Sequence, residues 1–255
     1  MKSTSDKIYW HKYNEFYENL IPANAKNILE IGVFKGESIR YWRELYSEAK
    51  IYGLDIVPAM PEWPQDDRIR YFQADQSDAQ KYRKILLSID QPIDLLIEDG
   101  SHDPLHQKIS LLESIDFLAP GAIYILEDLH TSHPGHEYYK KRAKTFNKSV
   151  LKFFGRNGNI FMPLQCLLLI DHLKTNQIAL ETVRNRINYA KSLFTFDEIE
   201  VLFKKIKKIT FYRRSVLPDY CYSCETNNFD FTNLKCACGA DLYAEADSMT
   251  AVIKF

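Results

Sequence analysis

The sequence lacks a long apolar segment. Its longest apolar run, residues 162–170, has about half of the roughly 20 residues that a membrane-spanning helix needs. Residues 1–7 are followed by amphipathic sequence and not by the continuous apolar stretch of a secretory signal. We therefore expect a cytoplasmic protein that has no membrane partner.

The chain also lacks an excess of charge of either sign. Its formal net charge is -1, whereas proteins that bind nucleic acid usually carry a global basic field. We therefore expect no nucleic-acid partner. Apolar residues make up 45% of the 255 residues, which allows a sizeable core, and we expect one large α/β domain with elaborations.

Short apolar segments of strand length alternate with segments of helical periodicity. Strands are predicted at residues 27–33, 51–55, 69–74, 93–98 and 122–126, and helices at 38–49, 78–89 and 105–118. This alternation indicates βαβ units and a parallel sheet with helices on both faces. The expected additions are an N-terminal helix within residues 1–22, a substrate-side insertion at 131–174 with a buried helix at 162–172, a helix capped by Thr195, and two last strands at 206–213 and 249–255.

Two of the predicted strands end in paired carboxylates followed by a histidine. Residues 93–98 end at Glu98 and Asp99, with His102 three residues later. The next strand ends at Glu127 and Asp128, and His130 follows. Parallel neighbours lie about 4.8 Å apart, so both sets would emerge at the same edge of the sheet. That edge is where open α/β sheets bind their ligands.

The first predicted strand leads through a glycine-bearing turn into a helix. The turn contains Gly32 and Gly36, which let a ligand approach the backbone, and Ser38 begins the helix. A dinucleotide fold requires G-x-G-x-x-G here, and that motif is absent. Glu30 stands two residues before the first glycine, where a carboxylate repels phosphate and attracts an amino or cationic group.

The next two strands end in residues suited to a nucleoside. Asp55 can accept hydrogen bonds from both hydroxyls of a ribose, and Asp75 and Gln76 can address an adenine amino group. A ribose acceptor and an adenine reader without a phosphate cradle describe S-adenosylmethionine better than NAD. Each acid taken singly could equally be a solvated strand cap.

These motifs resemble the class I S-adenosylmethionine-dependent methyltransferases. Within that class, residues 99–102 (Asp-Gly-Ser-His) and 127–132 (Glu-Asp-Leu-His-Thr-Ser) are similar to the metal-dependent sugar O-methyltransferases of macrolide tailoring. The resemblance covers residues 27–132 and the final strand, but neither the insertion nor the cysteines. It implies a Rossmann-like fold whose mostly parallel seven-stranded sheet has an antiparallel last strand.

The resemblance also implies roles for the acidic strand ends. Carried over by position, Asp99, Glu127 and Asp128 would bind Mg²⁺, and His102 would be the base that deprotonates a sugar hydroxyl. The chemistry of the residues agrees, because three converging carboxylates need a cation and an all-oxygen set selects a hard one, with Ca²⁺ and Mn²⁺ as alternatives. His130 is the rival base, and a supporting role is favoured for it.

Two alternatives to a sugar O-methyltransferase stay open. A catechol-type O-methyltransferase would also chelate a diol, although that family uses a lysine where this chain has His102. A zinc-bearing binding module without catalysis is the other. The acceptor is expected to be a small molecule or carbohydrate, such as a glycoside, a nucleotide sugar or a polysaccharide precursor, and a homo-oligomer is possible.

Four of the five cysteines lie within eighteen residues. Cys221 and Cys224 form a C-x-x-C pair and Cys236 and Cys238 a C-x-C pair, nearly the spacing of a structural zinc ribbon. We predict a structural Zn²⁺ in a hairpin insertion at residues 218–242, with free thiols as the alternative. Cys166 lies in an apolar run and is expected in the core.

Overall fold

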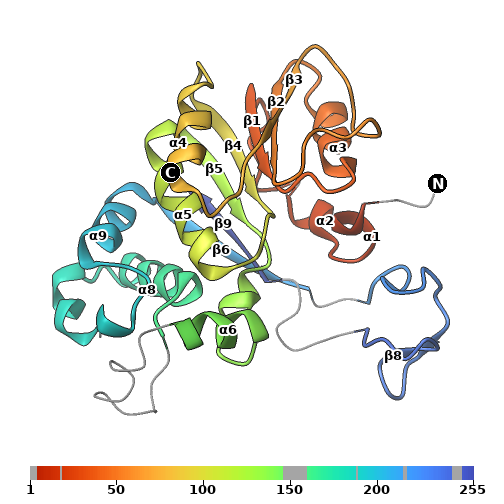
Figure 1. Cartoon of the computed structure of the whole chain (residues 1–255). Coiled ribbons are helices and arrows are strands. Elements are labelled where there is room, and N and C mark those ends of the chain that lie inside the picture. Colours follow the sequence, from red (N-terminus) through yellow and green to blue (C-terminus); the bar gives the residue numbers. More distant parts are fainter. Residues whose placement is uncertain (1–4, 18, 146–159, 188, 215–216, 243–248) are drawn as a thin grey trace.

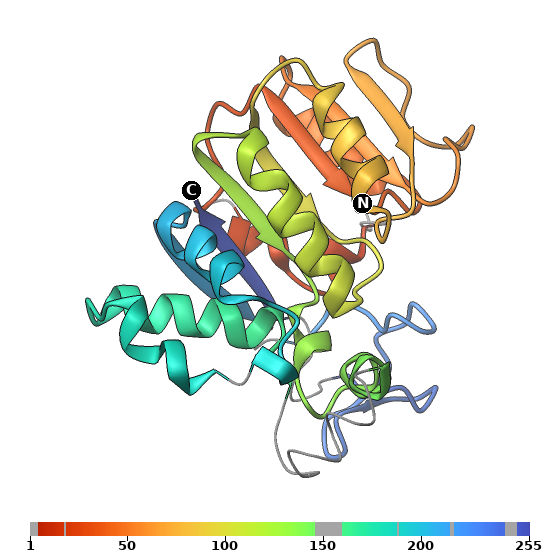
Figure 2. The same cartoon turned by 60° about the vertical axis from the view of Figure 1, so that its left-hand side comes forward.

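The computed structural model describes residues 5–17, 19–145, 160–187, 189–214, 217–242 and 249–255. A central twisted sheet is covered by helices on both faces (Figures 1 and 2). Its seven strands lie in the order β3-β2-β1-β4-β5-β9-β6. Their bounds are β1 Asn27–Ile31, β2 Lys50–Asp55, β3 Ile69–Gln73, β4 Ile93–Glu98, β5 Leu118–Leu126, β6 Lys208–Arg213 and β9 Met249–Lys254.

Strands β3, β2, β1, β4 and β5 are mutually parallel, whereas β9 is antiparallel to both β5 and β6. The predicted mostly parallel sheet with an antiparallel last strand is confirmed. In register, Ile31 of β1 pairs with Glu98 of β4, which in turn pairs with Leu126 of β5. The acidic residues that follow β4 and β5 therefore emerge beside the turn that follows β1.

The alternation of side chains along the strands separates two apolar cores. Leu29 and Leu96 belong to one core with helices α4, α5, α8 and α9, and Ile28 and Leu95 belong to the other with α2 and α3. The helices are α1 Asp6–Tyr9, α2 Tyr13–Tyr17, α3 Glu37–Leu45, α4 Ala79–Leu87, α5 Pro104–Ser114, α6 Glu137–Thr145, α8 Pro163–Thr175 and α9 Phe196–Lys205. The 3₁₀ turns are η1 Ile115–Phe117, η2 Leu129–Ser132, η3 Leu180–Arg186 and η4 Tyr189–Lys191.

Three predicted elements differ from the structure. The N-terminal helix is two short helices, because Lys12 between them adopts a left-handed conformation with φ 60°. The helix predicted at 105–118 ends at Ser114, and β5 begins at Leu118, so the proline and glycine expected to stop the helix lie inside the strand. Thr195 does cap α9, accepting a hydrogen bond from the Glu198 amide at 3.3 Å.

The segment between β5 and β6 contains η2, α6, α8, η3, η4 and α9, and α8 packs into the same core as Leu29. Phe153 and Phe154 of the predicted insertion lie outside the described residues. Residues 217–242 contain the short strands β7 Phe229–Asp230 and β8 Lys235–Cys236, and we name this segment the cysteine hairpin. Among the described residues, no helix has both the length and the apolarity to cross a membrane.

Candidate functional site

A cavity of about 970 Å³ opens at the carboxyl ends of β1, β2, β4 and β5. Its walls come from the turns after these strands and after β3, from α1, and from Tyr222 and Glu225 of the cysteine hairpin. The volume lies at the upper end of the range for small-molecule sites. It is large enough for a nucleoside and a second ligand side by side.

The turn after β1 forms the floor of this cavity. Gly32 has φ 91°, and a Cβ atom at this position would lie 2.0 Å from the backbone oxygen of Asp99, so only glycine allows this close approach. Asp55 accepts hydrogen bonds from the amides of Val33 and Phe34 at 2.8 and 3.1 Å. The predicted ribose acceptor thus lines the cavity and also holds the turn after β1 in place.

Two residues predicted to bind the cofactor do not line the cavity. Glu30 is fully buried, accepts a hydrogen bond from the Trp42 indole at 3.0 Å, and lies 3.7 Å from the ammonium of Lys7. Burial raises the pKa of Glu30 to about 7, and Lys7 opposes this only in part. Gly36, with φ 77°, precedes α3 and packs against Trp63. Both residues shape the floor from beneath, because their strand and turn positions face the α3 side of the sheet.

Gln76 lines the cavity but is engaged by its own protein. Its amide nitrogen donates to Glu98 and to Ser110, and its oxygen accepts from the Ser101 amide at 3.0 Å. Burial raises the pKa of Glu98 to about 7, which the hydrogen bond from Gln76 partly offsets. Gln76 thus fixes the loop that follows β4, and the neighbouring Asp75, which is exposed, also lines the cavity. Ser38 lines the cavity as predicted.

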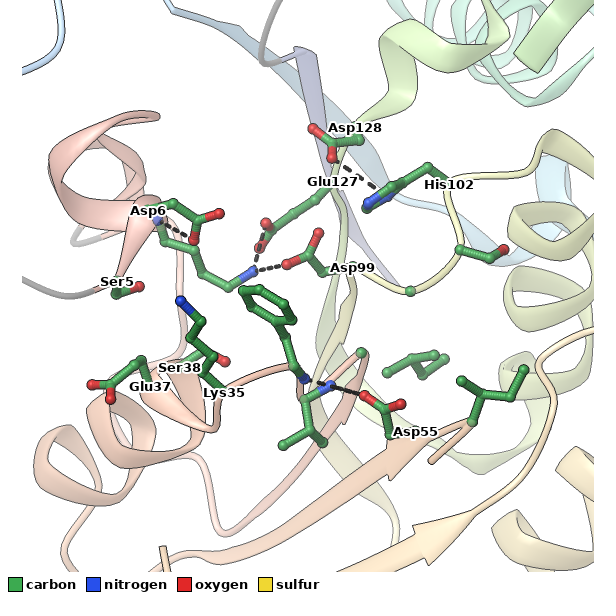
Figure 3. Close-up of a pocket in the computed structure, with 18 of the residues that line it drawn as sticks. Ser5, Asp6, Lys35, Glu37, Ser38, Asp55, Asp99, His102, Glu127 and Asp128 are labelled. Carbon is green, nitrogen blue, oxygen red and sulfur yellow. Dashed lines mark hydrogen bonds and ion pairs between the residues drawn. The ribbon is translucent and has the colours of Figure 1, made fainter. Parts of the chain in front are cut away.

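The acidic strand ends meet at one side of the cavity (Figure 3). Asp99, His102 and Asp128 each offer a ligand atom within 4.8 Å of the others. His102 Nδ1 lies 3.4 Å from Asp128 Oδ2. Burial lowers the pKa of His102, but the carboxylates of Asp128 and Asp99 outweigh it and leave the pKa above its ordinary value of 6.5. His130 lies farther out, with Nδ1 3.8 Å from Asp128 Oδ1.

Glu127, the third predicted metal ligand, also lines the cavity and is held by two side chains of the protein. Its side chain is buried and accepts hydrogen bonds from the Tyr17 hydroxyl and the Lys7 ammonium, both at 2.6 Å. Adjacent residues point in opposite directions at a strand end, and Asp128, with φ 49°, turns towards His102 instead. Of the three carboxylates predicted to bind metal, Asp99 and Asp128 lie beside His102, whereas Glu127 contacts Lys7, as Asp99 also does.

Lys7 is the functional residue that sequence reasoning missed. It comes from α1, is 7% exposed, and places its ammonium 2.5 Å from Asp99 Oδ2 and 2.6 Å from Glu127 Oε2. Burial lowers the pKa of Lys7, but the carboxylates of Asp99 and Glu127 hold it well above its ordinary value. No local pattern signals this role, since Lys7 lies 92 residues from Asp99 and 120 from Glu127.

The remaining carboxylates fit a hard divalent cation. Mg²⁺ is usually bound by one or two carboxylates and keeps several waters, and Asp99 and Asp128 offer this at the cavity wall. The four hairpin cysteines form a separate cluster whose sulfur atoms also lie within 4.8 Å of one another.

The sheet order, the cavity and this site define the Rossmann-like fold of a class I methyltransferase. Residues 29–129 match the family model described as a methyltransferase domain. Over this segment the chain resembles the class I S-adenosylmethionine-dependent methyltransferases.

Among curated proteins, the chain is similar to sugar O-methyltransferases of antibiotic pathways. The 8-demethyl-8-alpha-L-rhamnosyl tetracenomycin-C 2'-O-methyltransferase of Streptomyces olivaceus is 32% identical over 52% of this chain and 37% of the relative. The mycinamicin VI 2''-O-methyltransferase of Micromonospora griseorubida is 37% identical over 42% of this chain and 28% of the relative. The matched segment spans less than two fifths of either relative.

Solved structures of the MycE methyltransferase from the mycinamycin pathway are also similar. The complex with Mg and SAH is 29% identical, with a TM-score of 0.43, and covers 56% of this chain and 41% of that one. The complex with Mg, SAH and mycinamycin VI is 24% identical, with a TM-score of 0.46, and covers 71% of this chain and 43% of that one.

Proposed function

We propose that this protein transfers a methyl group from S-adenosylmethionine to a sugar hydroxyl, with the help of a divalent cation. The observation that carries the proposal is the convergence of Asp99, His102 and Asp128 on the wall of a cavity whose floor is the glycine turn after β1. The curated relatives, named as O-methyltransferases of a rhamnosyl tetracenomycin-C and of mycinamicin VI, support a sugar as the acceptor class.

The methyl donor fits the half of the cavity formed by the turns after β1, β2 and β3. Asp55 and Asp75 line the cavity, and in this proposal Asp55 accepts hydrogen bonds from the ribose hydroxyls and Asp75 from the adenine amino group. Phosphate-binding glycines are absent, so a sulfonium nucleoside suits these walls better than a dinucleotide. S-adenosylmethionine supplies an electrophilic methyl group there.

The acceptor fits the half that contains Asp99, His102 and Asp128. A divalent cation bound to the two carboxylates would orient a sugar diol and acidify the hydroxyl that reacts. His102 is suited to accept the hydroxyl proton, because Asp128, 3.4 Å away, stabilises the imidazolium that results. The enzyme's other task is alignment of the acceptor oxygen with the methyl group, and the rigid strand ends provide it.

The test separates binding from turnover. Titration calorimetry with S-adenosylhomocysteine is performed on the wild type and on His102→Ala, and methyl transfer is assayed with a panel of nucleotide sugars and glycosides in the presence of Mg²⁺. We expect His102→Ala to bind S-adenosylhomocysteine normally and to lose about 10²–10⁴-fold in turnover, the usual contribution of a general base.

Asp99→Asn and removal of divalent cations by a chelator are the second arm of the test. Both should abolish transfer, and Mg²⁺ should restore it only to the wild type. The proposal fails if the wild type does not bind S-adenosylhomocysteine, or if activity survives the chelator or the Asp99 substitution. Activity on catechols but not on sugars would reject the sugar acceptor.

A further inference from the structure

The four cysteines of the cysteine hairpin are placed as the corners of a metal site. Cys221 Sγ lies 3.7 Å from Cys238 Sγ, and Cys224 Sγ lies 3.4 Å from Cys236 Sγ. All four sulfur atoms lie within 4.8 Å of one another. Zinc binds thiolates tetrahedrally at about 2.3 Å, which sets the sulfur atoms about 3.8 Å apart. The observed spacing therefore fits one Zn²⁺ among four thiolates.

The backbone presents each cysteine pair through a hydrogen-bonded turn. The amide of Glu225 donates to the carbonyl of Cys221, four residues earlier, and the amide of Gly239 donates to the carbonyl of Cys236, three residues earlier, both at 2.8 Å. Glu225 and Gly239 each follow the second cysteine of a pair, and both adopt left-handed conformations with φ 55° and 91°. The two pairs, separated by 11 residues in sequence, thus supply two sulfur atoms each.

The cysteine hairpin has too small an apolar core to hold this arrangement without a crosslink. Its strands β7 and β8 have two residues each. Its own apolar cluster has three buried residues, Cys221, Cys236 and Leu242, with the partly buried Leu217, Cys224, Phe229 and Ala240 packed against them. Small units of this size are usually stabilised by disulfides or metals, and the four cysteines are not joined in disulfides. A bound metal supplies the missing stabilisation.

The cysteine hairpin holds α1, the helix that carries Lys7. The Tyr220 ring stacks on Tyr9 at 4.0 Å, and the Asp219 amide donates to the Tyr9 carbonyl at 3.0 Å. The buried Arg214 donates to the carbonyls of Trp10 at 3.3 Å and of Leu242 at 2.8 Å. Figure 1 shows the hairpin standing apart from the sheet, so its described contacts with the N-terminal segment join it to the cavity.

We propose that Cys221, Cys224, Cys236 and Cys238 bind one structural Zn²⁺. The zinc-bound hairpin then fixes α1 against the acidic wall of the cavity, which consists of Asp99, Glu127 and Asp128. Four protein ligands leave no open position, so the zinc is structural and does not take part in catalysis. Through Tyr222 and Glu225 the same hairpin forms part of the cavity wall, so zinc also maintains the shape of that wall.

The first experiment is elemental analysis of the purified full-length protein by mass spectrometry. We expect one zinc per chain in the wild type and in Cys166→Ala, whose cysteine lies in the core outside the cluster. Cys224→Ser combined with Cys238→Ser should lose it. Zinc-free wild type, iron in place of zinc, or zinc retained by the double variant would overturn the proposal.

Cobalt substitution keeps the test decisive if the double variant does not fold. Wild type loaded with Co²⁺ should develop the strong visible bands and thiolate-to-cobalt charge-transfer absorption of a tetrahedral four-sulfur site. Cys166→Ala should show the same spectrum. Weak octahedral bands in both proteins would reject the four-cysteine site.

The second experiment tests the link to α1 by hydrogen exchange. In the structure the amides of Trp10 and His11 donate to the carbonyl of Asp6 at 2.9 Å, and we expect the zinc-loaded protein to keep both bonds. Removal of zinc should deprotect these amides together with residues 217–242 and leave β4 protected. Unchanged exchange at residues 6–11 would refute the link. Neither experiment depends on methyl transfer, so the zinc proposal and the proposed function stand or fall separately.

Discussion

Substitution of Lys7 by methionine tests the charge balance at the acidic wall. The Lys7 ammonium faces Asp99 and Glu127 at 2.5 and 2.6 Å, and its removal leaves their carboxylates without a cation. Breaking a buried ion pair by removing one partner costs about 3–5 kcal/mol. In a domain of this size each kcal/mol lowers the melting temperature by about 2 °C or more, so a fall of at least about 6 °C is expected.

Magnesium should compensate for the lost ammonium. In the wild type a cation at Asp99 competes with Lys7, whereas in Lys7→Met the carboxylates are free to bind it. Mg²⁺ at about 100 times its dissociation constant would add about 2.7 kcal/mol to the free energy of unfolding of the variant, which raises its melting temperature by about 5 °C. The shift in the wild type should be smaller. Thermal unfolding followed by circular dichroism, with Mg²⁺ and with a chelator, measures both effects.

Lys12→Met is the matched control for this experiment. Lys12 lies in the same segment and pairs at 2.6 Å with Asp219, a carboxylate whose side chain is 59% exposed. Surface pairs of this kind contribute about 0–1 kcal/mol. Equal melting temperatures for the two variants, or equal responses to Mg²⁺, would refute the assignment of Lys7 as the cation that neutralises the acidic wall.

Three further predictions follow from particular contacts. Gly32→Ala should unfold the turn after β1 and abolish S-adenosylhomocysteine binding in calorimetry. Gly121→Ala is the control: Gly121 has φ 83°, but an added Cβ would meet no atom within 4 Å, so this substitution should cost only about 1–3 kcal/mol of backbone strain. Folding raises the pKa of Glu98 from 4.5 to about 7, so the folded protein binds this proton more tightly than the unfolded chain. As the pH rises from 4.5 to 7, the free energy of unfolding of the wild type, measured by urea denaturation, should fall by about 3 kcal/mol relative to that of Glu98→Gln. Parallel pH profiles for the two proteins would contradict this. NMR titration of the metal-free protein should place the pKa of His102 above 6.5. Mg²⁺ should lower this pKa, because it neutralises the carboxylates that face His102. A pKa below 6.5 in the metal-free protein would contradict the prediction.

The sheet could be predicted because each strand is recognisable from its own residues. Runs such as residues 93–98 are apolar throughout, and a strand buried on both faces requires this. The start of helix α9 could also be predicted from neighbouring residues, because Thr195 and Glu198 form its capping box within four residues. The division of the N-terminal helix was not, because it depends on the left-handed conformation of Lys12, which contacts Asp219 of the distant hairpin.

The sequence by itself determined the fold class, the edge of the sheet where ligands bind, and the residue types present there. These three properties follow from the order of apolar and acidic segments along the chain, because strand formation and strand ends depend on residues that are close in sequence. Only the tertiary structure decided which acids act together. It turned Asp128 towards His102, buried Glu127 beneath Lys7, and occupied Gln76 with Glu98. The reason is electrostatic: a buried carboxylate must find a cation or a donor, and that partner can come from any part of the chain that folding brings near.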